Sequence, residues 1–219
     1  MAESKLQLIE DLKECLSIAQ KEDDRAGEGM AYGHIGDVYR RLGNFQGAIE
    51  CHMKCLSIAK EVGDRAEEGK TYRDLGIDHE ELGKFQDATE YHNKDLSIAK
   101  ELSDRTGEEI ACGNPGNVYH SLGNFQKAIE YQNKYVTIAR EVGNRVGERI
   151  AYSCLGNAYQ SQGNLQEAIQ FSNESQQVLL LRKKKKKKKK KLPRACCPIQ
   201  SANLMQSRCV TCQPDSENS

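Results

Sequence analysis

The sequence has no tryptophan, only four phenylalanines and only four prolines among its 219 residues. A chain so poor in large rings must fill its interior with small and aliphatic side chains. Its longest aliphatic run, Val178 to Leu181, is far shorter than the roughly 20 apolar residues that cross a membrane. The first residues, MAESKLQLIEDLKE, include scattered acidic side chains. We therefore expect neither a secretory signal peptide nor a transmembrane helix.

The cysteines do not suggest a disulfide framework. Their number, nine, is odd, and five of them lie in segments expected to be helical. We therefore expect reduced thiols and a cytoplasmic protein. Near the C-terminus, Cys209 and Cys212 have the spacing of half a zinc site, but the adjacent Cys196 and Cys197 do not supply the other half. No metal and no other cofactor is predicted.

A formal net charge of zero hides an uneven distribution of charge. Residues 182–219 hold 12 of the 32 Lys and Arg but only 2 of the 32 Asp and Glu, which leaves 20 basic and 30 acidic residues in 1–181. Such an acidic body is not suited to nucleic acid. The sequence also lacks a phosphate-binding glycine loop and a metalloprotease motif. We expect no enzymatic activity and no small-molecule substrate.

The sequence does contain a repeat with a period of forty residues. The block at Ala31–Ala59, AYGHIGDVYRRLGNFQGAIECHMKCLSIA, returns at Thr71–Ala99, at Ala111–Ala139 and, less faithfully, from Ala151. A fixed period in this range is typical of stacked repeats, in which each unit buries its apolar face on the next. We therefore divide the chain into an array, 1–181, and a tail, 182–219. The array comprises a half-repeat at 5–22 and repeats that begin near 29, 69, 109 and 149.

Each block predicts two helices joined by a tight turn. Apolar residues recur at three- and four-residue steps in both halves of the block, as at Tyr32, Ile35 and Tyr39. Between the halves, Gly43 suits the left-handed residue that follows a helix end, and Asn44 suits the cap of the next helix.

Charged residues recur in the linkers between blocks. They are Arg25, Arg65, Arg105 and Arg145, together with Glu28, Glu68, Glu108 and Glu148. We interpret them as ion pairs that hold neighbouring repeats in register. Contact with a ligand is the alternative interpretation.

These features resemble the tetratricopeptide repeat, whose signature is an aromatic residue, Leu-Gly, a tyrosine and a later alanine. The first copy matches it at Tyr32, Gly36, Tyr39 and Ala48. The forty-residue period and the segments LGNF and LSIAKEVGDR resemble in particular the Pins-type (LGN-type) adaptors of spindle orientation and G-protein signalling. The resemblance implies an all-α fold, a right-handed superhelical array of antiparallel helix pairs. In such adaptors an extended or helical peptide of a partner lies along a concave wall made by the first helix of each pair.

Residues of these first helices that turn away from the aromatic stripe are expected to face the groove. Asparagine can donate to and accept from a peptide backbone at once, and arginine would select acidic ligand residues. The alternative is that these are ordinary solvated helix positions. The predicted groove residues are Asp37, Arg40, Arg73, Ile77, Glu80, Asn114, Asn117, His120, Asn157 and Gln160.

Two features depart from the repeat pattern. Pro115 stands where the signature has leucine, inside a predicted helix. It costs about 3 kcal/mol or more there, so we expect a kinked or weakly folded third repeat. Arg182 and the nine lysines of 183–191 predict a disordered tail.

The departures leave three hypotheses for function. The first is a noncatalytic adaptor that binds a peptide in the groove. The second is a truncated or degenerate repeat fragment without a competent groove, in which the lysine run is translated adenine-rich sequence. The third is a protein directed by Lys183–Lys191 to the nucleus, to nucleic acid or to an anionic membrane.

Overall fold

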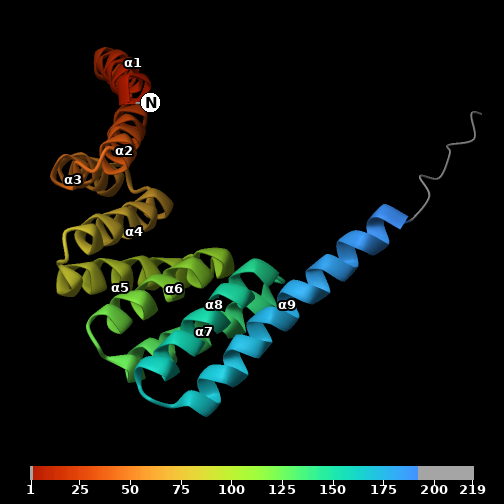
Figure 1. The fold of residues 1–219 in the computed structure, drawn as a ribbon. Coiled ribbons are helices and arrows are strands. Elements are labelled where there is room, and N and C mark those ends of the chain that lie inside the picture. The colour runs from red at the N-terminus through yellow and green to blue at the C-terminus, as the bar shows by residue number, and fades with distance from the viewer. Residues whose placement is uncertain (1, 192–219) are drawn as a thin grey trace, which may run out of the picture.

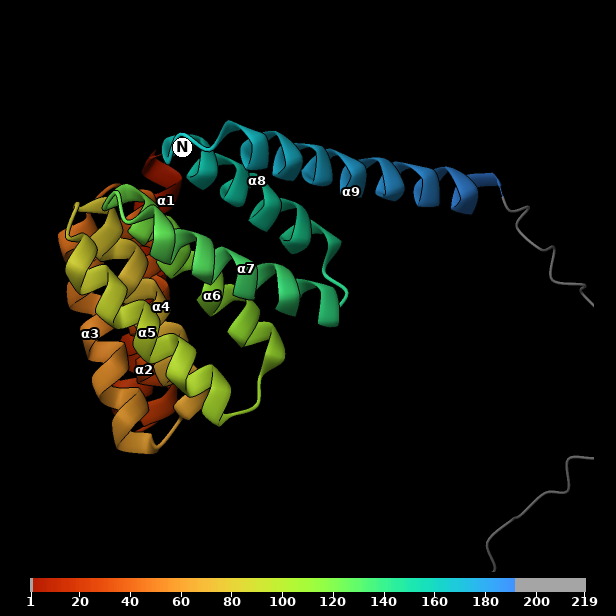
Figure 2. The same cartoon turned by 90° about the horizontal axis from the view of Figure 1, so that it is seen from below.

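The computed structural model describes the backbone of residues 2–191 and the side chains of residues 5–180. These residues form an all-helical array without strands. The helices are α1 (Ala2–Lys21), α2 (Arg25–Arg41), α3 (Phe45–Val62), α4 (Arg65–Glu81), α5 (Phe85–Glu101), α6 (Arg105–Ser121), α7 (Phe125–Glu141), α8 (Arg145–Ser161) and α9 (Leu165–Lys191). Each helix packs on its neighbours in the sequence. Figure 1 shows a curved stack that begins at α1, and Figure 2 shows α9 extending beyond the body.

The helix pairs coincide with the sequence repeats. The four pairs are α2/α3, α4/α5, α6/α7 and α8/α9, and α1 contains the half-repeat. The buried residues are mainly alanine, isoleucine, leucine and valine, with few rings, as expected from the composition. The predicted all-α array of helix pairs is therefore confirmed.

The turns follow the predicted chemistry. Gly43 has a φ of +78°, which a residue with a side chain rarely adopts. The side chain of Asn44 caps α3 by accepting a hydrogen bond from the amide of Gly47, at 3.0 Å. Between repeats, Asp64 caps α4 in the same way through the amide of Glu67, at 2.9 Å. Local sequence thus sets where the helices begin and end.

Two turns that precede a repeat lack the expected glycine, at Asp23, with a φ of +57°, and at Ser103. Ser103 has a φ of +55°, whereas Gly63 and Gly143 occupy the equivalent turns with φ values of +75° and +74°. The left-handed conformation costs a residue with a side chain roughly 1–2 kcal/mol, and the greater freedom of glycine in the unfolded chain offsets part of this. We expect Ser103→Gly to raise the free energy of unfolding by about 1 kcal/mol in urea denaturation. Gly63→Ser should lower it similarly, and unchanged midpoints in both variants would contradict this account.

The linker arginines form ion pairs, and those of Arg25, Arg65 and Arg105 join the two helices of one repeat and not neighbouring repeats. Arg65, at the start of α4, contacts Glu68 in its own helix and Glu101 at the end of α5, where its Nε donates to Oε1 at 3.1 Å. Arg25 and Arg105 make the equivalent contacts with α3 and α7. For these three arginines the predicted register between repeats was wrong, because antiparallel packing brings the end of a second helix beside the start of its own first helix. Glu148 does join neighbouring repeats, since its Oε1 accepts from Nε of Arg140 in α7 at 2.9 Å.

Helix α6 runs without a break through Pro115. It has 17 residues, as α4 and α8 do. Pro115 is fully buried, at the position that Leu75 and Leu155 occupy in their repeats. The third repeat is therefore fully helical. Its proline has no N–H, so the helix lacks the hydrogen bond to the carbonyl of Ala111, and this loss is destabilising.

The predicted boundary at residue 181 lies inside a helix. Helix α9 continues through Lys183–Lys191, where the sequence predicted disorder. Lysine is a good helix former, and a helix that the last repeat has nucleated extends at little cost. The disorder predicted for 192–219 and the half zinc site at Cys209 and Cys212 lie outside the described residues. Among the helices described, none is long and apolar enough to cross a membrane.

Candidate functional site

The four first helices, α2, α4, α6 and α8, carry all ten predicted groove residues. We call the surface formed by these residues the groove wall. Its two halves differ in chemistry. On α2 and α4 the charged side chains pair with other side chains of the protein, whereas on α6 and α8 amide side chains are exposed.

Arg40 lies among carboxylates of α2 and α4. Its guanidinium pairs with Asp37, lies 2.9 Å from Asp74 and lies 3.2 Å from Asp78. Asp78 is completely buried, and its other oxygen is 2.6 Å from Nδ1 of His52 in α3. Burial opposes the charge on Arg40, but the carboxylates outweigh it and raise the pKa of the guanidinium. The guanidinium of Arg40 is therefore already paired with carboxylates of the protein.

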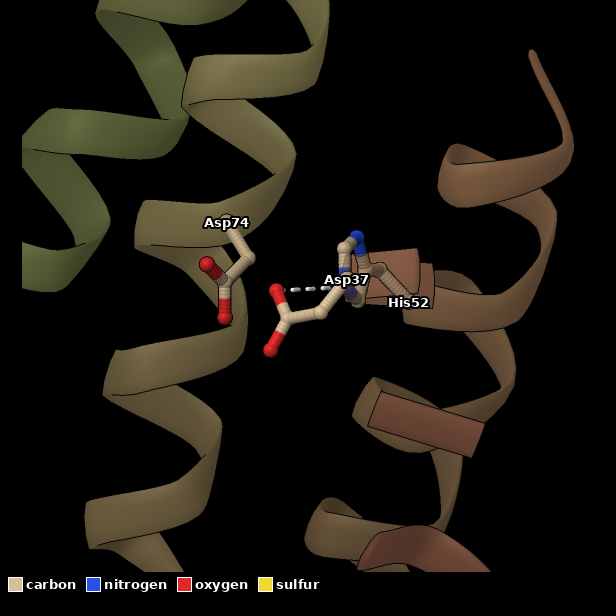
Figure 3. A group of neighbouring side chains, drawn as sticks. All are labelled: Asp37, His52 and Asp74. Atoms are coloured by element: carbon tan, nitrogen blue, oxygen red, sulfur yellow. Dashed lines mark ion pairs between the residues drawn. The ribbon is translucent and has the colours of Figure 1, made fainter. Parts of the chain in front are cut away.

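The same cluster has the ligand types of a cation site. Asp37, His52 and Asp74 each place one ligand atom within 4.8 Å of the others. Figure 3 shows these three side chains near one another. However, Arg40 contacts both carboxylates, so a guanidinium already supplies the positive charge. A metal ion would have to displace it. The arrangement is that of an ion-pair network between the first and second repeats.

The charged residues predicted on α4 are also paired. Arg73 donates from Nε and Nη2 to the two oxygens of Asp95 in α5, at 2.9 and 3.0 Å. Oε1 of Glu80 lies 2.7 Å from Nε2 of the buried His92. Ile77 is half-buried on the same helix. These pairs tie α4 to α5.

A small polar pocket lies between α6 and α8. Asn117, His120 and Asn157 line it together with Gln132 of α7, around a volume of about 160 Å³. Nε2 of Gln132 donates to Oδ1 of Asn117 at 3.1 Å. The amide nitrogen of Asn117 takes no part in that hydrogen bond. Nε2 of His120 is 3.1 Å from Oγ of Ser161. We call this site the amide pocket.

The remaining two predicted residues lie outside the lining of the amide pocket. Gln160 is exposed on α8, and Asn114 is half-buried on α6. The structure thus brings together three of the ten predicted side chains in one concavity and leaves these two on the same helices.

Gln132 is a pocket residue that the sequence analysis missed. It takes the second-helix position held by His52 and His92 in earlier repeats. A Cβ on Gly116 would clash with Gln132. In the same way, a Cβ on Gly36 would clash with His52 and a Cβ on Gly76 with His92. The signature glycine therefore makes room for a polar side chain sixteen residues later. That spacing is visible in the sequence and would have identified Gln132.

Comparison with known proteins places these features in context. The family model described as tetratricopeptide repeat matches residues 7–61, 28–101 and 110–180. No match was found among curated protein sequences.

Several solved structures are similar in fold. BtubC (BKLC) from P. vanneervenii has a TM-score of 0.68 and 18% identity, covering 93% of this chain and 88% of that one. A signal-transduction ATPase (STAND) with a tetratricopeptide repeat sensor, PH0952 from Pyrococcus horikoshii, has a TM-score of 0.71 and 21% identity. The match covers 84% of this chain and 29% of that one. The kinesin-light-chain TPR-like repeats of Podosopora anserina have a TM-score of 0.70 and 17% identity. The match covers 82% of this chain and 89% of that one. At these identities the likeness shows the fold alone.

Proposed function

Because the chain belongs to the tetratricopeptide repeat family, we propose that it is a noncatalytic adaptor that binds an extended peptide of a partner protein along the groove wall. The observation that carries this proposal is the amide pocket, where exposed Asn117 and Asn157 flank one concavity. Their side chains project from equivalent positions of α6 and α8, one repeat apart. An extended peptide that crosses both helices would meet them in succession.

The chemistry of the pocket suits a peptide backbone. A carboxamide can donate to a backbone carbonyl and accept from a backbone N–H, which holds an extended chain without selecting its side chains. Within the pocket, Oε1 of Gln132 is a buried acceptor that has no hydrogen-bond partner among the described residues. We assign ligand contact to Asn114, Asn117, His120, Asn157 and Gln160. Asp37, Arg40, Arg73, Ile77 and Glu80 then shape the other half of the wall.

We further propose that the repeats are of the Pins (LGN) type and that the protein acts in the cytoplasm. The forty-residue period and the segment LSIAKEVGDR support the subtype. The five cysteines of the described residues, all free thiols, support a reducing compartment.

The proposal is tested by selecting binders from a library of random 15-residue peptides and measuring their Kd by fluorescence polarisation. Each lost amide contact is expected to cost about 1 kcal/mol. Asn117→Ala and Asn157→Ala should therefore each weaken binding about fivefold, and the double variant about 25-fold. Asn133→Ala is the matched control, because Asn133 is an exposed asparagine on α7, outside the groove wall. It should leave Kd unchanged.

Other outcomes favour the other hypotheses. Failure to enrich any peptide would support the degenerate fragment. Another outcome is the enrichment of acidic peptides that no longer bind at high salt and that bind the two asparagine variants as tightly as the parent. That result would support binding through the lysine run.

A further inference from the structure

Three of the four second helices present an aromatic ring to the first helix of their own pair. The ring comes from the same position of each repeat and packs against one or two rings of the first helix. The contacts are Tyr91 with Tyr72 and His79 at centroid distances of 6.1 and 5.0 Å, Tyr131 with Tyr119 at 5.5 Å, and Phe171 with Tyr152 and Tyr159 at 6.0 and 5.3 Å.

The first pair lacks this ring. Cys51 takes its position, while Tyr32 and Tyr39 on α2 correspond to the two residues that enclose the ring in the second and fourth pairs. A cavity of about 490 Å³ lies here, lined by both tyrosines, Cys51, Leu16 and Ile35 among others. We call it the Cys51 cavity. The cavity marks the place of the missing ring.

A second cysteine shows the same relation between a missing ring and a cavity. Cys112 stands where Tyr32, Tyr72 and Tyr152 stand in the other repeats. It also lines a cavity, of about 720 Å³. In both repeats the loss of a ring coincides with open volume, so the Cys51 cavity follows from the sequence and not from an accident of packing.

The charges around the Cys51 cavity indicate what it would accept. In the third repeat, the hydroxyl of Tyr131 donates to Oδ1 of Asn93 on the preceding second helix, at 2.9 Å. The residues two repeats earlier are Cys51 and Lys13, and Lys13 lines the cavity. The far end of a ring placed in the cavity would thus meet an ammonium group.

A second ammonium group lies near the cavity. Nζ of Lys54 lies 4.9 Å from the centroid of the Tyr32 ring, and Glu50 is the one carboxylate in the lining. Lys13 and Lys54 both line the cavity, so two ammonium groups accompany the single carboxylate of Glu50. The surroundings therefore carry a net positive charge.

We propose that the Cys51 cavity binds an aromatic acid, with its ring between Tyr32 and Tyr39 and its carboxylate paired with Lys13. Ring burial between two tyrosines supplies the apolar part of the binding. The carboxylate makes a charge-assisted hydrogen bond with the ammonium group. This site is separate from the amide pocket, and the acid is bound without being chemically changed.

The test uses p-toluate, which is the tyrosine side chain with a carboxylate in place of its hydroxyl. Its Kd for the full chain is measured by ligand-observed NMR titration, beside uncharged p-cresol. We expect p-toluate to bind at least tenfold more tightly. Lys13→Gln should weaken p-toluate about tenfold and leave p-cresol unchanged, because only the acid uses the ammonium group.

Substitutions at the cavity locate the binding. Cys51→Tyr supplies the missing ring and should abolish binding, whereas Cys51→Ala leaves the cavity open and should preserve it. Cys112→Tyr is the matched control, because it adds a ring at the other cavity and should not change Kd. If Cys51→Tyr does not fold, as judged by circular dichroism, Cys51→Leu takes its place with at least a tenfold loss expected. The proposal is overturned if p-toluate does not bind, if p-cresol binds equally well, or if binding persists in the filled variant.

Discussion

Replacing Pro115 by leucine is expected to raise the free energy of unfolding by about 2–3 kcal/mol. A proline inside a helix removes one backbone hydrogen bond and crowds the preceding turn, and α6 accommodates it without a break. The first repeat has Ile35 at this position, and the second and fourth have Leu75 and Leu155, all buried. A branched aliphatic side chain therefore fits the site, and the variant regains the hydrogen bond without a large packing penalty.

The measurement is urea denaturation of the full chain followed by circular dichroism. A gain of this size is a large fraction of the 5–15 kcal/mol that stabilises a typical domain. The control is Leu155→Pro in the intact fourth repeat, which should lower stability by about 3 kcal/mol or more. If Pro115→Leu left the midpoint unchanged while Leu155→Pro lowered it, the third repeat would be shown to have adapted to its proline.

The fold was largely predictable because each of its determinants is local in the sequence. The forty-residue period located the pairs, and Gly43 with Asn44 located the turn within the first. Each helix packs mainly on its sequence neighbours, so the apolar stripe of one helix specifies its partner. The helical state of Lys183–Lys191 was not predicted, because composition alone does not show that the last repeat nucleates the helix.

The site was less predictable because its charges are paired across helices. Asp78 is buried where the other repeats have Val38, Val118 and Ala158. The sequence shows this exception, but only the structure shows that Arg40 of α2 forms an ion pair with Asp78 of α4. Asn117 and Asn157 are exposed, and the helical pattern places them on the same face as the paired residues of α2 and α4. It does not show which polar residues are exposed and which pair internally.

Another such pair yields the second prediction. One position of each first helix faces one position of the second helix of the same repeat, and the two side chains vary together. The facing pairs are Gly33 with Cys55, Arg73 with Asp95, Gly113 with Tyr135 and Ser153 with Ser175. In two of these pairs glycine faces a larger residue, and in the fourth repeat two hydroxyls face each other. In the second repeat a cation, Arg73, faces an anion, Asp95.

Breaking this pair from one side should be far more costly than replacing both members. Arg73→Ser leaves Asp95, which is 1% exposed, without its counter-ion, and we expect a loss of about 3–5 kcal/mol. Asp95→Ser should cost less, about 1–2 kcal/mol, because the partly exposed Arg73 side chain can turn toward water. The double variant copies the fourth repeat, whose serine hydroxyls lie 3.0 Å apart. It should come within about 1 kcal/mol of the parent.

The pH dependence distinguishes a lost ion pair from simple loss of packing. Burial raises the pKa of Asp95 above its usual value even beside Arg73, and removal of the guanidinium should raise it further. The folded Arg73→Ser variant then retains a proton that the unfolded chain has released, so its stability should fall as pH rises from about 4 toward 7. The double variant has no carboxyl at this position and should not share that fall. Parallel pH profiles for the two variants would mean that Arg73 contributes packing and not charge.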